Sequence, residues 1–180
     1  MKETALHNKH VEADAKMTNF GGWEMPLKFT SINEEHMAVR EKAGIFDVSH
    51  MGELYLKGDD ALDFMSKHCT QNIIDSEVGQ IKYAHMLNEE GGIIDDTLVN
   101  KLSKDSCYIV PNAGNTEKVY NWLSERGGEE YIKNITENTV MIALQGPEAE
   151  RVLSEISEQD VTEIGFFRSK HLELNDEIMS

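Results

Sequence analysis

Three apolar runs joined by short turns constrain the fold of this chain more than any other feature. The runs are Ile81–Asn88, Ile93–Leu102 and Cys107–Val110, and the turns between them are Glu89–Gly92 and Lys104–Asp105. Consecutive strands with such short connections pair as antiparallel neighbours, because a parallel pair needs a long crossover. The sequence therefore predicts an antiparallel meander near the centre of the chain.

Short helices are predicted on both sides of this meander. Ser31 is followed three residues later by Glu34, which is the spacing of a capping box at a helix start. Helices and hairpins in irregular order favour an α+β fold, with antiparallel sheets and short flanking helices. By contrast, the two glycines and the proline of 17–26 indicate a loop. The helices that we expect are 5–15, 31–43, 60–68, 112–125 and one that starts at 146–147.

The charge of the chain excludes several classes of partner. Seventeen basic and thirty-three acidic side chains give a net charge of −16, which repels nucleic acid and anionic membranes. Apolar runs such as Met141–Leu144 are far shorter than a membrane span, and Met1–Thr4 lacks the apolar stretch of a secretory signal. The two cysteines, Cys69 and Cys107, suit a reducing compartment. We therefore expect a cytoplasmic protein that binds neither nucleic acid nor membrane.

The adjacent acids Asp95 and Asp96 stand within the apolar run Gly91–Val99. Neighbours on a strand point to opposite faces, so one carboxylate can face solvent while the other faces a core or a cavity. An inward carboxylate is costly unless it is paired, hydrogen-bonded or used in chemistry. The sequence leaves two interpretations open, an acid that caps nearby amides and a functional acid.

The sequence does not support a catalytic triad, a metal site or a nucleotide site. Asp47, Ser49 and His50 are too close in sequence to form a catalytic triad. The cysteines and histidines lack the spacing of metal ligands, and neither phosphate-binding glycine motif occurs. We therefore expect no metal site and no nucleotide site.

Read together, several stretches resemble the N-terminal half of the aminomethyltransferase family, the T protein of the glycine cleavage system. They occur in the family's order and at its spacing, and the resemblance extends to about Arg168. The most specific are the Asp-Val-Ser-His-Met-Gly and Gly-Gly-Ile-Ile-Asp-Asp runs. The matching stretches are Phe20–Pro26, Glu34–Arg40, Phe46–Gly52, Leu87–Asp96, Asn112-Ala113 and Ala143–Pro147.

The resemblance implies a function and a site. The family transfers the one-carbon unit of an aminomethyl group, carried on the lipoyl arm of the H protein, to tetrahydrofolate, and releases ammonia. Asp96 matches the family's key acid, whereas Asp95 keeps its structural interpretation. Met51, Tyr83 and Asn112 match positions that line the folate pocket. The implied cofactor is tetrahydrofolate, as the one-carbon acceptor, with no metal.

The resemblance also implies a domain division and an incomplete chain. Residues 1–55 would be the N-terminal part of the first folate-binding domain, 56–165 a portion of a ferredoxin-like α/β sandwich, and 166–180 an acidic tail. The family's chain is roughly twice as long, and its Tyr-Thr-Gly-Glu-Asp-Gly motif does not occur here. Three hypotheses follow: an enzyme that needs a complementing C-terminal chain, an inactive module that binds folate or H protein, and a degenerate product that folds poorly.

Overall fold

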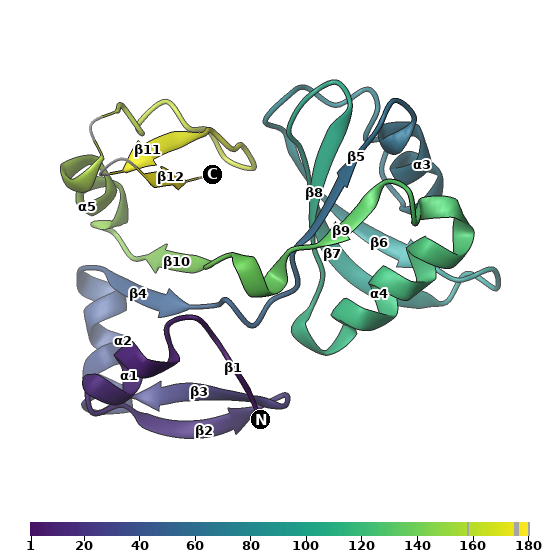
Figure 1. Ribbon diagram of the computed structural model, residues 1–180. Helices are drawn as coiled ribbons and strands as arrows, with labels where there is room; N and C mark the ends of the chain where they lie inside the picture. Colours follow the sequence, from purple (N-terminus) through teal and green to yellow (C-terminus); the bar gives the residue numbers. More distant parts are fainter. Residues whose placement is uncertain (158, 175–176, 180) are drawn as a thin grey trace. The chain divides into compact units, whose positions relative to one another are not determined.

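The computed structural model describes residues 1–157, 159–174 and 177–179, and it consists of two compact units (Figure 1). The first unit comprises 1–50, 139–165 and 170–180, and the second comprises 51–138 and 166–169. Both are built from antiparallel sheets and short helices, so the predicted α+β class is confirmed.

The predicted domain boundaries after residues 55 and 165 stay a prediction. Part of the expected acidic tail, residues 175, 176 and 180, lies outside the described residues.

A five-stranded sheet forms the second unit, with strand order β6-β7-β8-β5-β9. Every neighbouring pair in it is antiparallel, and β6, β7 and β8 follow one another as the predicted meander. The earlier strand β5 then pairs with the far side of β8 and receives β9 on its other edge. The strands are β5 (Leu54–Lys57), β6 (Ile81–Leu87), β7 (Ile93–Lys101), β8 (Ser106–Val110) and β9 (Ile132–Asn134).

A register shift near the start of β7 decides which way its acids point. Leu87 pairs with Ile93 and Met86 pairs with Asp95, so Ile94 is an extra residue on β7. Such a bulge lets two consecutive residues face the same side, and both Ile94 and Asp95 are buried. Beyond the bulge the usual alternation holds, with Asp96 exposed.

Helices α3 (Ala61–His68) and α4 (Thr116–Leu123) cover one face of this sheet (Figure 1). Alternate strand residues face them and form a single buried cluster with apolar helix residues. The opposite face, called the outer face below, carries Tyr83, Asp96 and Leu98. Cluster members with zero exposure include Leu54, Leu56, Met65, Val99, Ile109, Val119 and Leu123.

Glu53 and Asp95 are the buried acids among the described residues of this unit, and Glu53 is the one whose pKa is raised. Glu53 precedes β5 and is 2% exposed, and burial raises the pKa of its carboxyl despite a hydrogen bond with the Tyr108 side chain. Its Oε2 atom has no hydrogen-bond partner. Because Leu54 faces the helices, Glu53 and Tyr108 belong to the outer face.

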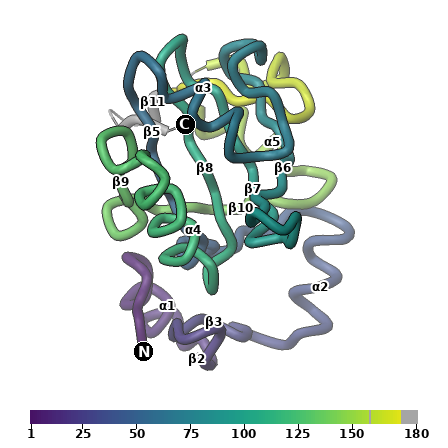
Figure 2. The backbone as a smooth tube through the Cα atoms, turned by 90° about the vertical axis from the view of Figure 1, so that its right-hand side faces the viewer, coloured from purple at the N-terminus to yellow at the C-terminus, as the bar shows by residue number. Residues whose placement is uncertain are grey.

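The first unit begins with a three-stranded sheet of order β1-β3-β2, beside which helix α1 (His7–Glu12) lies (Figure 2). The prediction of a loop over 17–26 is wrong, because β2 and β3 form a hairpin there. Gly21 and Gly22 are its two turn residues and have φ values of +60° and +92°. A two-residue hairpin turn needs this left-handed backbone, which glycine adopts without strain. The strands are β1 (Lys2–Glu3), β2 (Lys16–Phe20) and β3 (Trp23–Lys28).

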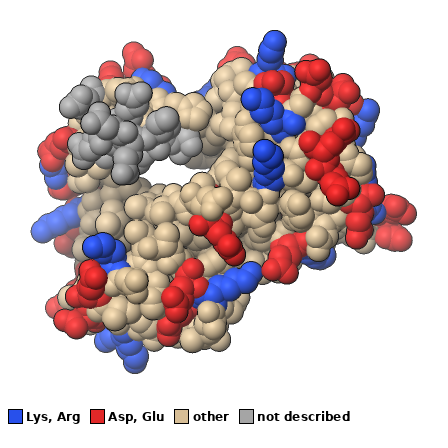
Figure 3. Space-filling view, in the orientation of Figure 1, with Lys and Arg blue, Asp and Glu red and all other residues tan. Residues whose placement is uncertain are grey.

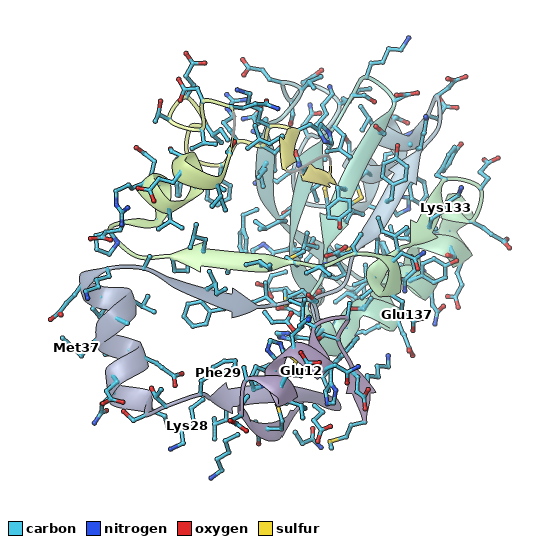
Figure 4. All side chains as sticks on the ribbon, turned by 60° about the vertical axis from the view of Figure 1, so that its left-hand side comes forward. Glu12, Lys28, Phe29, Met37, Lys133 and Glu137 are labelled. Atoms are coloured by element: carbon cyan, nitrogen blue, oxygen red, sulfur yellow. The ribbon has the colours of Figure 1, made fainter. Side chains whose placement is uncertain are left out.

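The predicted capping box starts helix α2 (Ile32–Glu41). Ser31 Oγ accepts a hydrogen bond from the Glu34 amide at 3.2 Å and donates one to its carboxylate at 2.8 Å. Glu35 accepts hydrogen bonds from the amides of Phe29 and Thr30, which fixes the connection that enters the helix. Figure 4 shows Phe29 in this connection.

A two-stranded ribbon of β4 (Gly44–Asp47) and β10 (Ile142–Gln145) follows α2 and is also part of the first unit. Phe46 and Asp47, the first two residues of the family-like stretch 46–52, belong to β4. Gly146 has φ +117°, and a Cβ on it would come within 2.5 Å of the Lys42 carbonyl oxygen. The remaining elements are helix α5 (Ala149–Ile156), strands β11 (Leu172–Leu174) and β12 (Glu177–Met179), and short turns of helix at Ala113–Asn115, Ser124–Gly128 and Thr136–Asn138.

Substitution of Leu56 by alanine tests the core of the second unit. The side chain has zero exposure, so we expect the free energy of unfolding to fall by about 2–5 kcal/mol in urea denaturation. Ile93→Ala, at a side chain that is 63% exposed, is the matched control and should change it by less than about 0.5 kcal/mol. Equal effects of the two variants would contradict the described core.

Glu53→Gln tests the raised pKa of Glu53. The folded state holds the Glu53 proton more tightly than the unfolded chain, so this group lowers the free energy of unfolding as pH rises above the ordinary value of 4.5 and through the raised pKa. Glutamine cannot ionise, so the free energy of unfolding of the variant, relative to wild type, should rise between pH 4 and 8. Urea denaturation across this pH range measures the difference, and Glu90→Gln, at an exposed acid, is the control. A difference from wild type that does not change with pH would refute the assignment.

Candidate functional site

Asp96 and Tyr83 form the centre of the candidate site, on the outer face of the five-stranded sheet. Tyr83 comes from β6 and Asp96 from β7, and the register sets His85 directly opposite Asp96. Tyr83 is two residues from His85, so both side chains share the face of Asp96. The Tyr83 hydroxyl donates a hydrogen bond of 2.5 Å to Asp96 Oδ2.

This hydrogen bond moves the pKa values of its two partners in opposite directions. The Tyr83 hydroxyl stabilises the Asp96 carboxylate and is the largest cause of its lowered pKa, to which Asn112 and the nearby His85 also contribute. The same carboxylate raises the pKa of Tyr83, because it disfavours a phenolate beside it. At neutral pH the site therefore holds an ionised acid and a neutral phenol.

Asn112 joins the two neighbouring acids. Its Nδ2 donates to Asp95 Oδ1 at 3.0 Å, to the Asp96 carbonyl at 3.0 Å and to Asp96 Oδ1 at 3.2 Å. Its backbone amide donates to Asp95 Oδ2 at 2.9 Å. Asn112, which was predicted to line the folate pocket, is thus hydrogen-bonded to both acids.

Asp95 has the structural role that the sequence left open. It is 3% exposed, and both of its oxygens accept hydrogen bonds from Asn112. Asn115 Nδ2 donates a further one to Oδ1 at 2.6 Å. These donors offset the cost of burying a carboxylate. Asn115 was not among the predicted site residues, although its three-residue spacing from Asn112 is a usable signal.

Met51 lies at the start of the second unit, and its side chain is half-buried. The amide of the next residue, Gly52, donates a hydrogen bond of 3.0 Å to the carbonyl of Pro111. This contact brings the backbone beside Met51 close to that beside Asn112. The structure therefore gathers Tyr83, Asp96 and Asn112 by side-chain contact, and Met51 by its backbone neighbours.

The arrangement suits a ligand that carries or develops positive charge. Asp96 is exposed and ionised, and its two oxygens are held by a phenol and an amide. A carboxylate held in this way can stabilise a developing cation or accept a proton without reorienting. Tyr83 is 47% exposed and offers its ring to a flat ligand on the same face.

Among the described residues, one group has the geometry to hold a metal ion. Glu3, His7 and Glu24 of the first unit each offer a ligand atom, and these atoms lie within 4.8 Å of one another. His7 Nε2 lies 2.9 Å from Glu24 Oε2, and this hydrogen bond is the largest cause of the raised pKa of His7. His7 Nδ1 lies 3.7 Å from Glu3 Oε2 and has no hydrogen-bond partner among the described residues, so only one ring nitrogen is hydrogen-bonded to a carboxylate. The expected absence of a metal stays a prediction.

Asp47, which was considered for a catalytic triad, has structural partners. Asp47 accepts hydrogen bonds from Thr4 Oγ1 at 2.6 Å and from the Ser49 amide at 2.9 Å, and its Oδ2 lies 2.8 Å from His10 Nε2. Both cysteines are free thiols, and burial raises the pKa of Cys107 to about 12. In the described part of the chain, no helix has the length and apolar character needed to cross a membrane.

Comparison with known proteins agrees with the motifs. The GCVT N-terminal domain family matches residues 6–178. An aminomethyltransferase of Thermotoga sp. (strain RQ2) is 46% identical over 172 residues, which are 94% of this chain and 47% of that protein. One of Desulfitobacterium hafniense (strain DCB-2) is 41% identical over 97% of this chain and 48% of its own length.

A solved structure supports the same relationship. The crystal structure of glycine cleavage system aminomethyltransferase T from Bartonella henselae matches 97% of this chain and 48% of its own chain, with a TM-score of 0.86 and 32% identity. The chain spans about half the length of the curated relatives it matches. Because the family match covers almost all of the sequence, the chain belongs to the GCVT N-terminal domain family.

Proposed function

We propose that this chain carries the catalytic acid and part of the folate site of a glycine cleavage aminomethyltransferase. In this reaction an aminomethyl group on the lipoyl arm of the H protein gives its carbon to tetrahydrofolate. Methylenetetrahydrofolate, ammonia and the dihydrolipoyl H protein are the products. The observation that carries the proposal is the contact of Asp96 with Tyr83 and Asn112, in a chain of this family.

Asp96 would act through its charge and its position. Its lowered pKa keeps it ionised near neutral pH, so it can stabilise positive charge at the transferring carbon and take up a proton from the reacting amine. The anchored carboxylate would also orient the folate nitrogens, which is a proximity effect.

The remaining site residues would bind the pterin. The Tyr83 ring and the Met51 thioether suit a flat heterocycle, and the Asn112 amide suits its polar edge. Tetrahydrofolate as acceptor and lipoylated H protein as donor are the proposed partners, together with a complementing polypeptide for the remaining half of the family's length. We also propose a cytoplasmic location, with which the two free thiols agree.

A second candidate function is a module that binds folate or H protein without turnover. The chain spans about half the length of the curated relatives it matches. Ammonia release from aminomethyl-lipoyl H protein with tetrahydrofolate, measured with and without a complementing polypeptide, separates the two functions. Folate binding without ammonia release in both samples would favour the module.

Asp96→Asn tests the role of the acid. Asparagine keeps the shape and can still accept a hydrogen bond from Tyr83, but it removes the charge. We expect ammonia release, with the complementing polypeptide present, to fall roughly 10²–10⁴-fold, while tetrahydrofolate affinity measured by calorimetry changes by less than about tenfold. Asp75→Asn, the same change at an exposed acid of the same unit, is the control and should retain full activity. A fully active Asp96→Asn variant would rule out the proposed role.

The titration of Tyr83 tests the electrostatics of the site without turnover. Asp96 raises the pKa of this phenol, so Asp96→Asn should lower that pKa toward its ordinary value of 10. The ultraviolet absorbance of phenolate, corrected by subtraction of a Tyr83→Phe variant, follows this one group. An unchanged Tyr83 titration in Asp96→Asn would mean that the two side chains do not interact in solution.

A further inference from the structure

The two units differ in how much apolar surface they bury. Every member of the buried hydrophobic cluster belongs to the second unit. Among the described residues of the first unit, the buried hydrophobic side chains are Trp23, Met25, Val161 and Leu172. Large apolar side chains of the first unit are exposed instead, including Phe29 and Met37 at 45% and 46%; Figure 4 shows Met37 on α2.

Ile45, the most exposed of these side chains, and Ile142 lie on the β4–β10 ribbon. Ile45 is 72% exposed and Ile142 is 54% exposed. The register pairs Ile45 with Leu144 and Asp47 with Ile142, so both isoleucines point to the same face of the ribbon. Phe46 is 45% exposed and points to the opposite face. The ribbon therefore presents uncovered apolar side chains on both faces.

The edges of the ribbon are also open. β4 and β10 pair only with each other among the described strands, and Figure 4 shows them side by side. The outer edge of each strand thus carries backbone groups available to another strand. A lone two-stranded ribbon is at best marginally stable in water, and three or more strands with a covered face are the usual stable arrangement. The ribbon has the features of an incomplete sheet.

Two observations indicate what completes it. The curated relatives extend well beyond the region that this chain matches, by about as many residues again, so a polypeptide of suitable length exists in the family. A second copy of this chain is a poor occupant, because each copy carries a net charge of −16 and like charges oppose association. Figure 3 shows acidic side chains spread widely over the face in view.

We propose that the β4–β10 ribbon is the docking surface for a polypeptide that corresponds to the second half of the family's chain. This partner adds a β-strand to a free edge of the ribbon and covers the face of Ile45 and Ile142. Strand addition satisfies the open backbone groups, and its apolar residues bury the exposed isoleucines. The inference rests on the complementing polypeptide of the proposed function and assigns it a site.

Co-expression tests this surface. The probe is the segment of the Thermotoga maritima aminomethyltransferase beyond its match to this chain; that enzyme is 46% identical over the matched 169 residues. The full 180-residue chain carries an affinity tag, and the retained probe is quantified. We expect a complex of one chain with one probe by light scattering, and slower amide hydrogen exchange in 44–47 and 142–145 than in the chain alone.

The variants are Ile45→Asp and Ile142→Asp. Both side chains are exposed, so the chain should fold as before, but a partner would have to bury the new carboxylate. Probe retention should fall roughly tenfold or more. Ile93→Asp is the matched control, at an isoleucine of the second unit that is 63% exposed, and should retain the probe as wild type does.

Three results would overturn the proposal: no complex with the wild-type chain, full retention of the probe by both ribbon variants, or a homodimer that protects the ribbon amides and excludes the probe. Tetrahydrofolate binding is read separately, by calorimetry. If it is present while docking fails, only the docking surface is wrong. If docking succeeds while tetrahydrofolate does not bind the complex, the proposed function is wrong and the surface stands.

Discussion

The candidate site depends on the hydrogen bonds that the buried carboxylate of Asp95 accepts. The carboxylate accepts hydrogen bonds from the amide and side chain of Asn112 and from the side chain of Asn115. These bonds tie β7 to the turn before α4, which holds Asn112 against the neighbouring acid. A buried acid without such donors would be strongly destabilising, so the pairing fixes the local geometry. Asp96 is presented to the outer face as a consequence.

The sequence predicted much of this region and missed its decisive details. Alternation along 93–102 correctly assigned opposite faces to Asp95 and Asp96, and short turns predicted the meander. The bulge at Ile94 was not predictable, because it depends on how β7 pairs with β6 and not on β7 alone. The assignment of 17–26 failed for a related reason, since Gly21-Gly22 can belong to a loop or to a two-residue hairpin turn. In both cases strand pairing, a long-range property, decided between locally similar conformations.

The outer face carries two tyrosine–carboxylate pairs whose acids have pKa shifts of opposite sign. Asp96 is exposed, and its hydrogen bond with Tyr83 outweighs the small cost of desolvation, so its pKa falls. Glu53 is buried, and desolvation outweighs its hydrogen bond with Tyr108, so its pKa rises. A tyrosine paired with a carboxyl group therefore accompanies a lowered pKa at Asp96 and a raised pKa at Glu53. Burial, which depends on the whole fold, sets this difference.

The two units differ in how far their apolar side chains are buried. The second unit holds Asp96, Tyr83 and Asn112 on a sheet with its own hydrophobic cluster, so its geometry has support within the described chain. The first unit has a capped helix and a well-paired hairpin, but its ribbon leaves Ile45 and Ile142 in solvent. Helix caps and hairpin turns can form without a completed core, whereas apolar side chains are buried only where another layer of the structure covers them. The candidate site therefore lies on the unit that has its own hydrophobic cluster, whereas the ribbon with the exposed isoleucines belongs to the other unit.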